Sequence, residues 1–186
     1  MSGVDAATPG PGPVARSGAS FPAMRSAKVP RSVVAGPYGH PFHPVAVTIP
    51  IGAWSSSLVF DLLGLAADDP RAFATGSRWL IAIGLGGAVG ASVLGLLDMS
   101  RIPPGTPARR TALVHLCLNV TAMVLFSMSL VVRLLDLGRI PGVAFLLSVI
   151  AASGLSVSGW LGGKLAYRWG VRVADENTQR EGFETA

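Results

Sequence analysis

Four long apolar runs leave this chain few folds to adopt. Each run is long enough to cross a bilayer, because about 20 apolar helical residues span about 30 Å of hydrocarbon. Half of the 186 residues are hydrophobic and only 13% are charged, which is unusual for a soluble domain. We therefore expect an all-α fold, an integral membrane four-helix bundle over residues 37–173. The expected spans cover about residues 44–65, 78–97, 111–132 and 140–163.

The segments outside the apolar runs have the composition of tails. Residues 1–36 are rich in Pro, Gly, Ala and Ser, carry basic residues, and lack helical or strand periodicity, so we expect a disordered basic tail. No stretch in this tail has the apolar length that a secretory signal requires, so no cleaved signal peptide is expected. Residues 174–186 are expected to form a short polar tail.

Lys and Arg are unevenly divided between the two sides of the predicted bundle. The two tails and the loop between the second and third spans hold 11 of the 15, whereas the other two loops hold the remaining four. The positive-inside rule then places both termini in the cytoplasm. The basic residues do not gather in one block, so we expect no nucleic-acid partner. The expected partners are the lipid bilayer and other membrane protein subunits.

The first span is preceded by the motif Gly-His-Pro-Phe-His-Pro at residues 39–44. Proline is favoured at the first helical position, and the residue before a proline is pushed out of the helical region. We therefore expect His43 to enter a helix that starts at Pro44, and His40 to lie in an extended segment just outside it. The two imidazoles could converge near one helix end.

The expected topology brings further polar residues to the same side of the membrane. Ionisable groups at membrane depth are costly and usually mark a site or a cavity. Imidazoles suit haem and several metals, and a carboxylate can complete or orient a ligand set. The candidate ligands are His40, His43 and His115 for haem b or a metal ion, with Asp98 added for a metal; the supporting residues are Arg101, Asn119, Lys164 and Tyr167.

The residues leave three interpretations of this cluster open. It could bind a haem or a metal, it could face a quinone or move a proton, or it could be a structural hydrogen-bond network. In the network, His43 caps the first helix and Asp98 pairs with Arg101 or His115. No nucleophile elbow, phosphate loop or suitably placed pair of acids is present, so we expect no catalytic activity of its own.

Other features indicate how the helices pack. Asp61 and Arg133 lie at the opposite end from the histidines, and we expect them to form a structural ion pair. Pro50 is expected to bend the first span. Two stripes of small residues in the second span, one containing Gly86 and the other Gly95, allow close helix approach. The first and third spans begin near histidine and the second and fourth are glycine-rich, a pattern that suggests duplicated helix hairpins.

Together these residues resemble a bacterial membrane family, domain of unknown function 2231. The resemblance covers about residues 40–173 and is implied by the double His-Pro motif and by segments that follow it. These segments are Phe60-Asp61, Gly95-Leu96-Leu97-Asp98, Arg109-Arg110 with His115 and Asn119, and Gly162-Gly163 with Tyr167 and Gly170-Val171. The resemblance implies a four-helix domain of the bacterial inner membrane, found alone or beside Rieske iron–sulfur or cytochrome-like domains.

Two functions from different classes follow from these observations. The first is an accessory subunit of a respiratory or other electron-transfer assembly, whose histidine cluster binds haem or a metal or faces a quinone. The second is a non-catalytic membrane scaffold that binds lipids or partner subunits. The chain has no Rieske ligand pattern and no Cys-x-x-Cys-His attachment site for haem.

Overall fold

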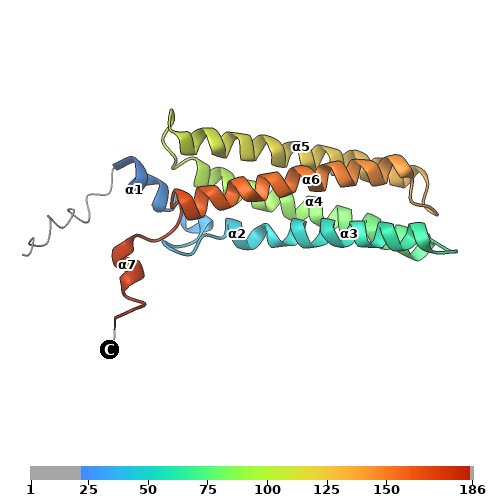
Figure 1. The fold of residues 1–186 in the computed structure, drawn as a ribbon, viewed down its shortest axis with the longest axis horizontal. Helices are drawn as coiled ribbons and strands as arrows, with labels where there is room; N and C mark the ends of the chain where they lie inside the picture. The colour runs from blue at the N-terminus through green and yellow to red at the C-terminus, as the bar shows by residue number, and fades with distance from the viewer. Residues whose placement is uncertain (1–21, 185–186) are drawn as a thin grey trace, which may run out of the picture.

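Four long helices lie side by side in an elongated bundle (Figure 1). The computed structural model describes residues 22–184, which contain helices and no strand. The helices are α3 (Thr48–Ala66), preceded by the short α2 (His43–Ala46), then α4 (Arg71–Met99), α5 (Pro107–Leu135) and α6 (Gly142–Gly163), which continues into the π-helical turn η2 (Lys164–Arg168). The predicted all-α, four-helix membrane fold is confirmed.

Two of the helices extend well beyond the spans that hydropathy indicates. α4 begins seven residues before the expected start at residue 78, and α5 begins at Pro107 rather than at residue 111. At the start of α5, Pro107 occupies the first turn and the Thr106 hydroxyl accepts a hydrogen bond from the Arg109 N–H at 3.1 Å. Hydropathy detects the apolar part of a helix, whereas caps determine where the helix begins.

The first span is interrupted at Val47, between α2 and α3. Pro50 lies four residues after Ala46 and has no N–H, so the Ala46 carbonyl cannot receive the usual helical hydrogen bond from it. The helix is therefore interrupted three residues before the proline, while Val47 itself keeps a helical backbone conformation; the bend at Pro50 stays a prediction.

The helices pack as two hairpins. α3 packs on α4 and α5 packs on α6, while the α4–α5 and α3–α6 contacts join the hairpins. α3 and α5 therefore lie diagonally across the bundle, and their large inward side chains meet at its axis. Trp54 of α3 stacks on Phe126 of α5 with ring centroids 4.3 Å apart.

The two hairpins repeat the same pattern of inward residues. Five inward residues of α2 and α3 each have a counterpart in α5 that lies 72 positions later in the sequence, as Arg133 follows Asp61. The inward residues of α4 recur in α6 at an equally constant interval. The pairs are His43/His115, Pro50/Ala122, Trp54/Phe126, Ser57/Ser129 and Asp61/Arg133, and then Ser77/Ala144, Gly84/Ala151, Ala91/Ser158 and Gly95/Gly162. These constant intervals support the duplicated helix hairpins that the sequence suggests.

The glycine stripes of α4 face in two directions. A Cβ on Gly84 would meet Trp54 of α3, and a Cβ on Gly95 would meet His43 of α2. These glycines therefore allow α2 and α3 to approach α4 closely. Gly86 and Gly90 have no neighbouring atom within 4 Å and face outward. Of the two stripes of α4, the inward one packs closely against a neighbouring helix in the described residues, and the outward one does not.

A cap covers the end of the bundle at which α2 begins and α4 ends, which we call the His end. It comprises α1 (Pro22–Lys28), the 3-10 turn η1 (Val33–Ala35) and the C-terminal segment with α7 (Glu176–Arg180). Figure 1 shows α1 and α7 at this end. The expectation of disorder through residue 36 does not hold for residues 22–36; residues 1–21 lie outside the described chain.

Specific contacts explain why this part of the tail is ordered. Ala27 and Ala35 are buried, and the Ser26 hydroxyl donates to the Arg101 carbonyl at 3.1 Å. The Lys28 ammonium donates to the Val173 carbonyl at 3.1 Å. Small buried residues and long-range polar contacts produce no periodic pattern, so they could not be predicted from the sequence.

Candidate functional site

His43 lies on α2 and its ring packs against α4. Its Nδ1 is 2.9 Å from the Ala91 carbonyl oxygen. Gly95 follows Ala91 by one turn on the same face of α4, and a Cβ there would lie 3.0 Å from His43 Cε1. Such a contact is tighter than most real Cβ contacts, so a side chain at this position would push the imidazole away, and glycine leaves room for it.

His115 lies on α5 and repeats this arrangement against α6. Its Nδ1 is 2.8 Å from both the carbonyl oxygen and the hydroxyl of Ser158. Gly162 lies one turn beyond Ser158, and a Cβ there would be 3.3 Å from His115 Cε1. The Asn119 amide donates to the His115 carbonyl at 2.9 Å and so stays within its own helix.

The two imidazoles face one another across the bundle. Their ring centroids are 6.4 Å apart and their planes are perpendicular, at 90°. A carbonyl oxygen can only accept, so each Nδ1 carries a proton, and in the neutral form of the imidazole each Nε2 keeps its lone pair. No residue among 22–184 forms a hydrogen bond with either Nε2. The pair therefore presents two unprotonated nitrogen donors from diagonal helices.

The other two candidate ligands do not join this pair. His40 is exposed in the loop before α2. Asp98 is buried, but its carboxylate lies 2.8 Å from the Arg172 guanidinium rather than beside a histidine or Arg101. Nowhere in the described chain do three His, Cys, Asp or Glu side chains gather as a metal cluster. Of the four candidate ligands, the structure therefore brings together His43 and His115, and it does not bring His40 or Asp98 to them.

Arg172 is a buried residue that sequence reasoning missed. It has a positive φ of 62° and is only 3% exposed. Besides its ion pair with Asp98, its guanidinium donates to the carbonyls of Ala35 at 2.9 Å and Gly36 at 3.0 Å. It therefore ties the cap to the end of α4. No sequence signal separates it from the neighbouring basic residues of the C-terminal segment.

Three of the four supporting residues form no hydrogen bond with the His pair. Arg101 is half-buried near the cap, and its Nε has no hydrogen-bond partner within residues 22–184. The Lys164 ammonium lies 4.9 Å from the Trp169 ring centroid. Tyr167 is 92% exposed. Of the four supporting residues, only Asn119 contacts a histidine of the pair.

The expected ion pair at the opposite end is confirmed. Arg133 donates to both carboxylate oxygens of Asp61, at 2.7 and 2.6 Å, and both residues are almost completely buried. The Arg133 Nε also donates to the Ser129 hydroxyl at 3.1 Å, and Ser129 contacts Ser148 at 2.9 Å. This bidentate pair links the diagonal helices α3 and α5 at one end as the histidines do at the other.

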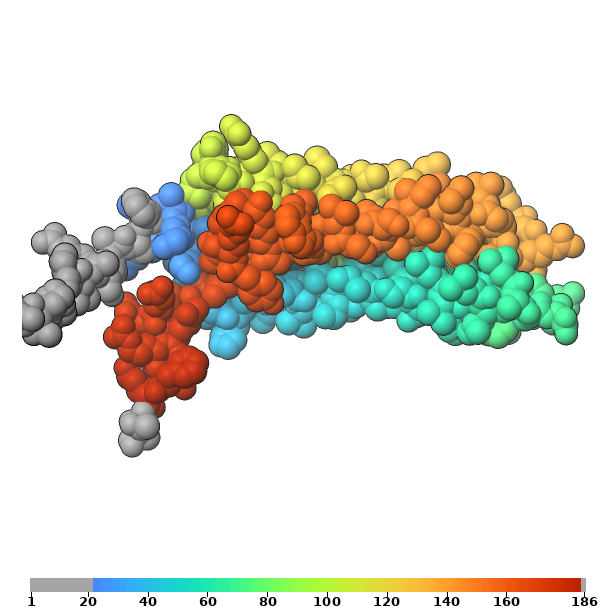
Figure 2. Space-filling view, in the orientation of Figure 1, coloured from blue at the N-terminus to red at the C-terminus, as the bar shows by residue number. Residues whose placement is uncertain are grey.

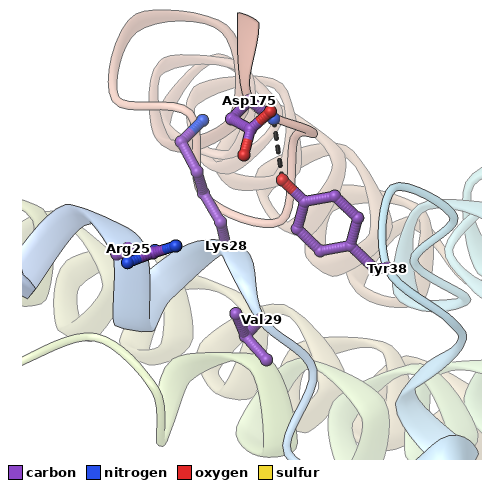
Figure 3. Close-up of a pocket in the computed structure, with 5 residues that line it drawn as sticks. All are labelled: Arg25, Lys28, Val29, Tyr38 and Asp175. Carbon is purple, nitrogen blue, oxygen red and sulfur yellow. Dashed lines mark hydrogen bonds between the residues drawn. The ribbon is translucent and has the colours of Figure 1, made fainter. Parts of the chain in front are cut away.

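Two surface cavities lie at the His end, and neither borders the His pair. The first, of about 200 Å³, is shown in Figure 3 and lies inside the cap between Arg25, Lys28, Val29, Tyr38 and Asp175. The Tyr38 hydroxyl accepts a hydrogen bond from the Asp175 N–H at 2.8 Å. The hydrogen bond from the backbone N–H of Thr178 lowers the pKa of the Asp175 carboxyl. The second, of about 460 Å³, lies on the outside of α6 and η2.

The outward surface of the bundle is apolar along all four long helices. Large side chains such as Ile51, Val89, Val131 and Leu146 are each more than half exposed. The four helices are long and apolar enough to cross a membrane, over His43–Ala66, Arg71–Met99, Pro107–Leu135 and Gly142–Arg168. These features define a polytopic α-helical membrane protein with lipid-facing sides.

Comparison with known families agrees with this class. Residues 39–175 match the family model described as "Predicted membrane protein (DUF2231)", and the chain belongs to this family. No curated protein and no solved structure matches the chain. The match covers α2 through η2 and therefore includes both histidines of the pair.

Proposed function

We propose that this protein binds one haem b between His43 and His115 and serves as an electron-transfer subunit of a membrane assembly. The single observation that carries the proposal is the perpendicular pair of imidazoles with centroids 6.4 Å apart. Both rings come from helices at diagonal corners of the bundle, and both have their Nδ1 atoms engaged by main-chain carbonyls.

The separation of the rings supports ligation of one metal centre. A transition-metal ion bonds an imidazole nitrogen at about 2.0–2.1 Å, so two imidazoles can share one ion only if both rings lie within a few ångströms of it. A centroid distance of 6.4 Å between His43 and His115 meets this requirement. Metal-bound histidines also commonly donate their other ring N–H to a carbonyl, as His43 and His115 both do.

The number of ligands favours haem over a free metal ion. A protein-bound zinc site normally has three or four protein ligands, and no third His, Cys, Asp or Glu gathers with the pair in residues 22–184. Haem iron needs only axial ligands from the protein, because the macrocycle supplies the equatorial ones.

The inward residues around the pair are small. On α4 and α6 at this level they are Ala91, Gly95, Ser158 and Gly162. One layer deeper, the inward positions of α3 and α5 are Pro50 and Ala122. The first large side chains towards the bundle centre are Trp54 and Phe126, which stack on each other. Small side chains at these positions support the proposal, because a macrocycle would need space beside the imidazoles.

The chain's residues would then hold and orient the cofactor. When bound, haem supplies one-electron transfer. The Ala91 and Ser158 carbonyls accept from the imidazoles and so fix their orientation. Gly95 and Gly162 lack a Cβ and so leave room for the rings. The apolar surroundings and the nearby cations of the His end would tune the potential, because burial and local charge set the redox properties of haem.

We also propose that the His end faces the cytoplasm of a bacterium, in whose inner membrane the protein lies. Ten of the fourteen Lys and Arg residues in the described chain lie at this end, in the cap, the α4–α5 loop and the segment after α6. The positive-inside rule assigns such an end to the cytoplasm. In this orientation His43 and His115 would hold the cofactor in the cytoplasmic half of the membrane, within reach of a partner subunit or carrier on that side.

The experiment is the haem content of the protein purified in mild detergent after expression with a haem precursor. We expect about one haem per chain in the wild type and in the control His40→Ala, and little in His43→Ala or His115→Ala, since each removes an axial ligand. A wild-type protein that stays colourless after haem supplementation would overturn the proposal.

The same variants test the competing structural interpretation. If the histidines only hold the helices together, His43→Ala and His115→Ala should lower thermal stability in detergent while the wild type binds no haem. This result would favour the non-catalytic scaffold. Retention of haem by both variants would show that the ligands lie elsewhere.

A further inference from the structure

We propose that the outer surface at the end of α6 binds one anionic glycerophospholipid through its phosphate. The site is the cavity of about 460 Å³ lined by Trp160, Gly163, Lys164, Tyr167 and Arg168. It lies on the outside of the bundle, whereas the His pair lies at the bundle axis, so this proposal does not depend on haem binding. The C-terminal part of α6 is visible on the surface in Figure 2.

The lining residues share one face because of their spacing. Residues three, four, seven and eight positions after Trp160 lie on the same side of a helix. At Lys164 the helix changes to a π-helical turn, in which the Trp169 N–H bonds the Lys164 carbonyl at 3.3 Å. The wider turn brings Lys164 between two indole rings, and such turns are frequent at functional sites.

The two cations of the cavity have no acidic partner. The Lys164 ammonium lies 5.7 Å from the Trp160 ring centroid and 4.9 Å from that of Trp169, so it is held by indole faces. Neither Lys164 nor Arg168 forms an ion pair with a carboxylate of residues 22–184. Their charges are therefore available to an external anion, and a phosphate accepts hydrogen bonds from both kinds of side chain.

The aromatic residues place these cations at the depth of lipid phosphates. Trp160 is 69% exposed and Tyr167 is 92% exposed, and both lie at the end of a membrane-spanning helix. Exposed Trp and Tyr at such positions occupy the headgroup region. Basic pockets at this depth bind the headgroups of anionic lipids.

The surface below the cavity can hold an acyl chain. Ser153, Ser156 and Gly159 form a stripe of small exposed residues on α6, leading towards Gly163. The two serine hydroxyls donate to carbonyls of their own helix, at 2.9 and 3.1 Å, so the stripe presents no unsatisfied donor to lipid. A phospholipid would contact both the cations Lys164 and Arg168 and this stripe, whereas free phosphate would contact the two cations alone.

The test is lipid retention by native mass spectrometry of the purified full-length protein, with phosphatidylglycerol and phosphatidylcholine as probes. We expect the wild type to retain one phosphatidylglycerol in preference to phosphatidylcholine. The double variant Lys164→Gln/Arg168→Gln should lose this preference, with an affinity about fivefold weaker for each charge removed. The matched control is Arg110→Gln, which removes an exposed charge at the same end and outside the cavity; it should behave as the wild type.

Three outcomes would overturn the proposal. They are equal retention of the two lipids by the wild type, an equal loss in Arg110→Gln, and complete displacement of phosphatidylglycerol by inorganic phosphate. Haem content measured on the same samples separates the two proposals. The double variant should keep the haem content of the wild type, because neither residue touches the His pair.

Discussion

Single glycines determine where the two imidazoles can lie. Gly95 and Gly162 each lie beneath one ring, one turn beyond the residue whose carbonyl fixes Nδ1 of that ring. The helix repeat places these two contacts on one face, so a histidine that docks on the carbonyl also covers the glycine. The geometry of the pair is therefore set by α4 and α6 as much as by the helices that carry the histidines.

This arrangement predicts the effect of one added side chain. Gly95→Val should displace His43 and reduce haem content severalfold, since even a Cβ would lie 3.0 Å from His43 Cε1. Gly90→Val is the matched control, because the same change is made on the same helix where no atom lies within 4 Å. Haem content and the visible spectrum of both variants provide the measurement. An equal effect of the two would show that Gly95 has no special role.

At the scale of the helices, the diagonal pair α3 and α5 is joined at three levels. His43 faces His115, Trp54 stacks on Phe126, and Asp61 pairs with Arg133. The members of each pair are 72 positions apart in the sequence. The last pair joins opposite charges, so α3 and α5 are held together by a buried ion pair at this end.

This buried pair predicts a strong dependence on both partners. Asp61→Leu should destabilise the protein by about 3–5 kcal/mol, because it leaves Arg133 buried and uncompensated. The double variant Asp61→Leu/Arg133→Met should recover most of that loss, since an apolar replacement of both partners is often neutral. Thermal unfolding in detergent measures both changes. If the double variant were no more stable than Asp61→Leu, the structural role of the Asp61–Arg133 ion pair would be contradicted.

For the molecule as a whole, the sequence predicted the membrane spans and the end at which the histidines lie, but not the contacts of the cap. Hydropathy located the four spans because membrane helices need long apolar runs. Topology placed His43 and His115 at one end, but could not show that His40 stays in solvent or that Asp98 pairs with Arg172. Those outcomes depend on the cap, whose contacts join residues more than 130 positions apart and leave no periodic pattern.

The orientation of the molecule gives a separate prediction. Gly105 lies exposed in the loop between α4 and α5 at the His end. In a Cys117→Ala background, Gly105→Cys should react with a membrane-impermeant thiol reagent only after the cytoplasmic side is opened. Gly138→Cys, in the loop after α5 at the opposite end, is the matched position and should react from outside. The reverse pattern would invert the proposed topology.

The most direct test of haem ligation by His43 and His115 is chemical rescue. His43→Gly and His115→Gly each remove one imidazole and leave space for a free one. We expect each variant to lose the low-spin spectrum of six-coordinate haem, added imidazole to restore it, and His40→Gly to keep it without addition. A spectrum that is unchanged in His43→Gly and His115→Gly, or a wild type without bound haem, would contradict ligation by this pair.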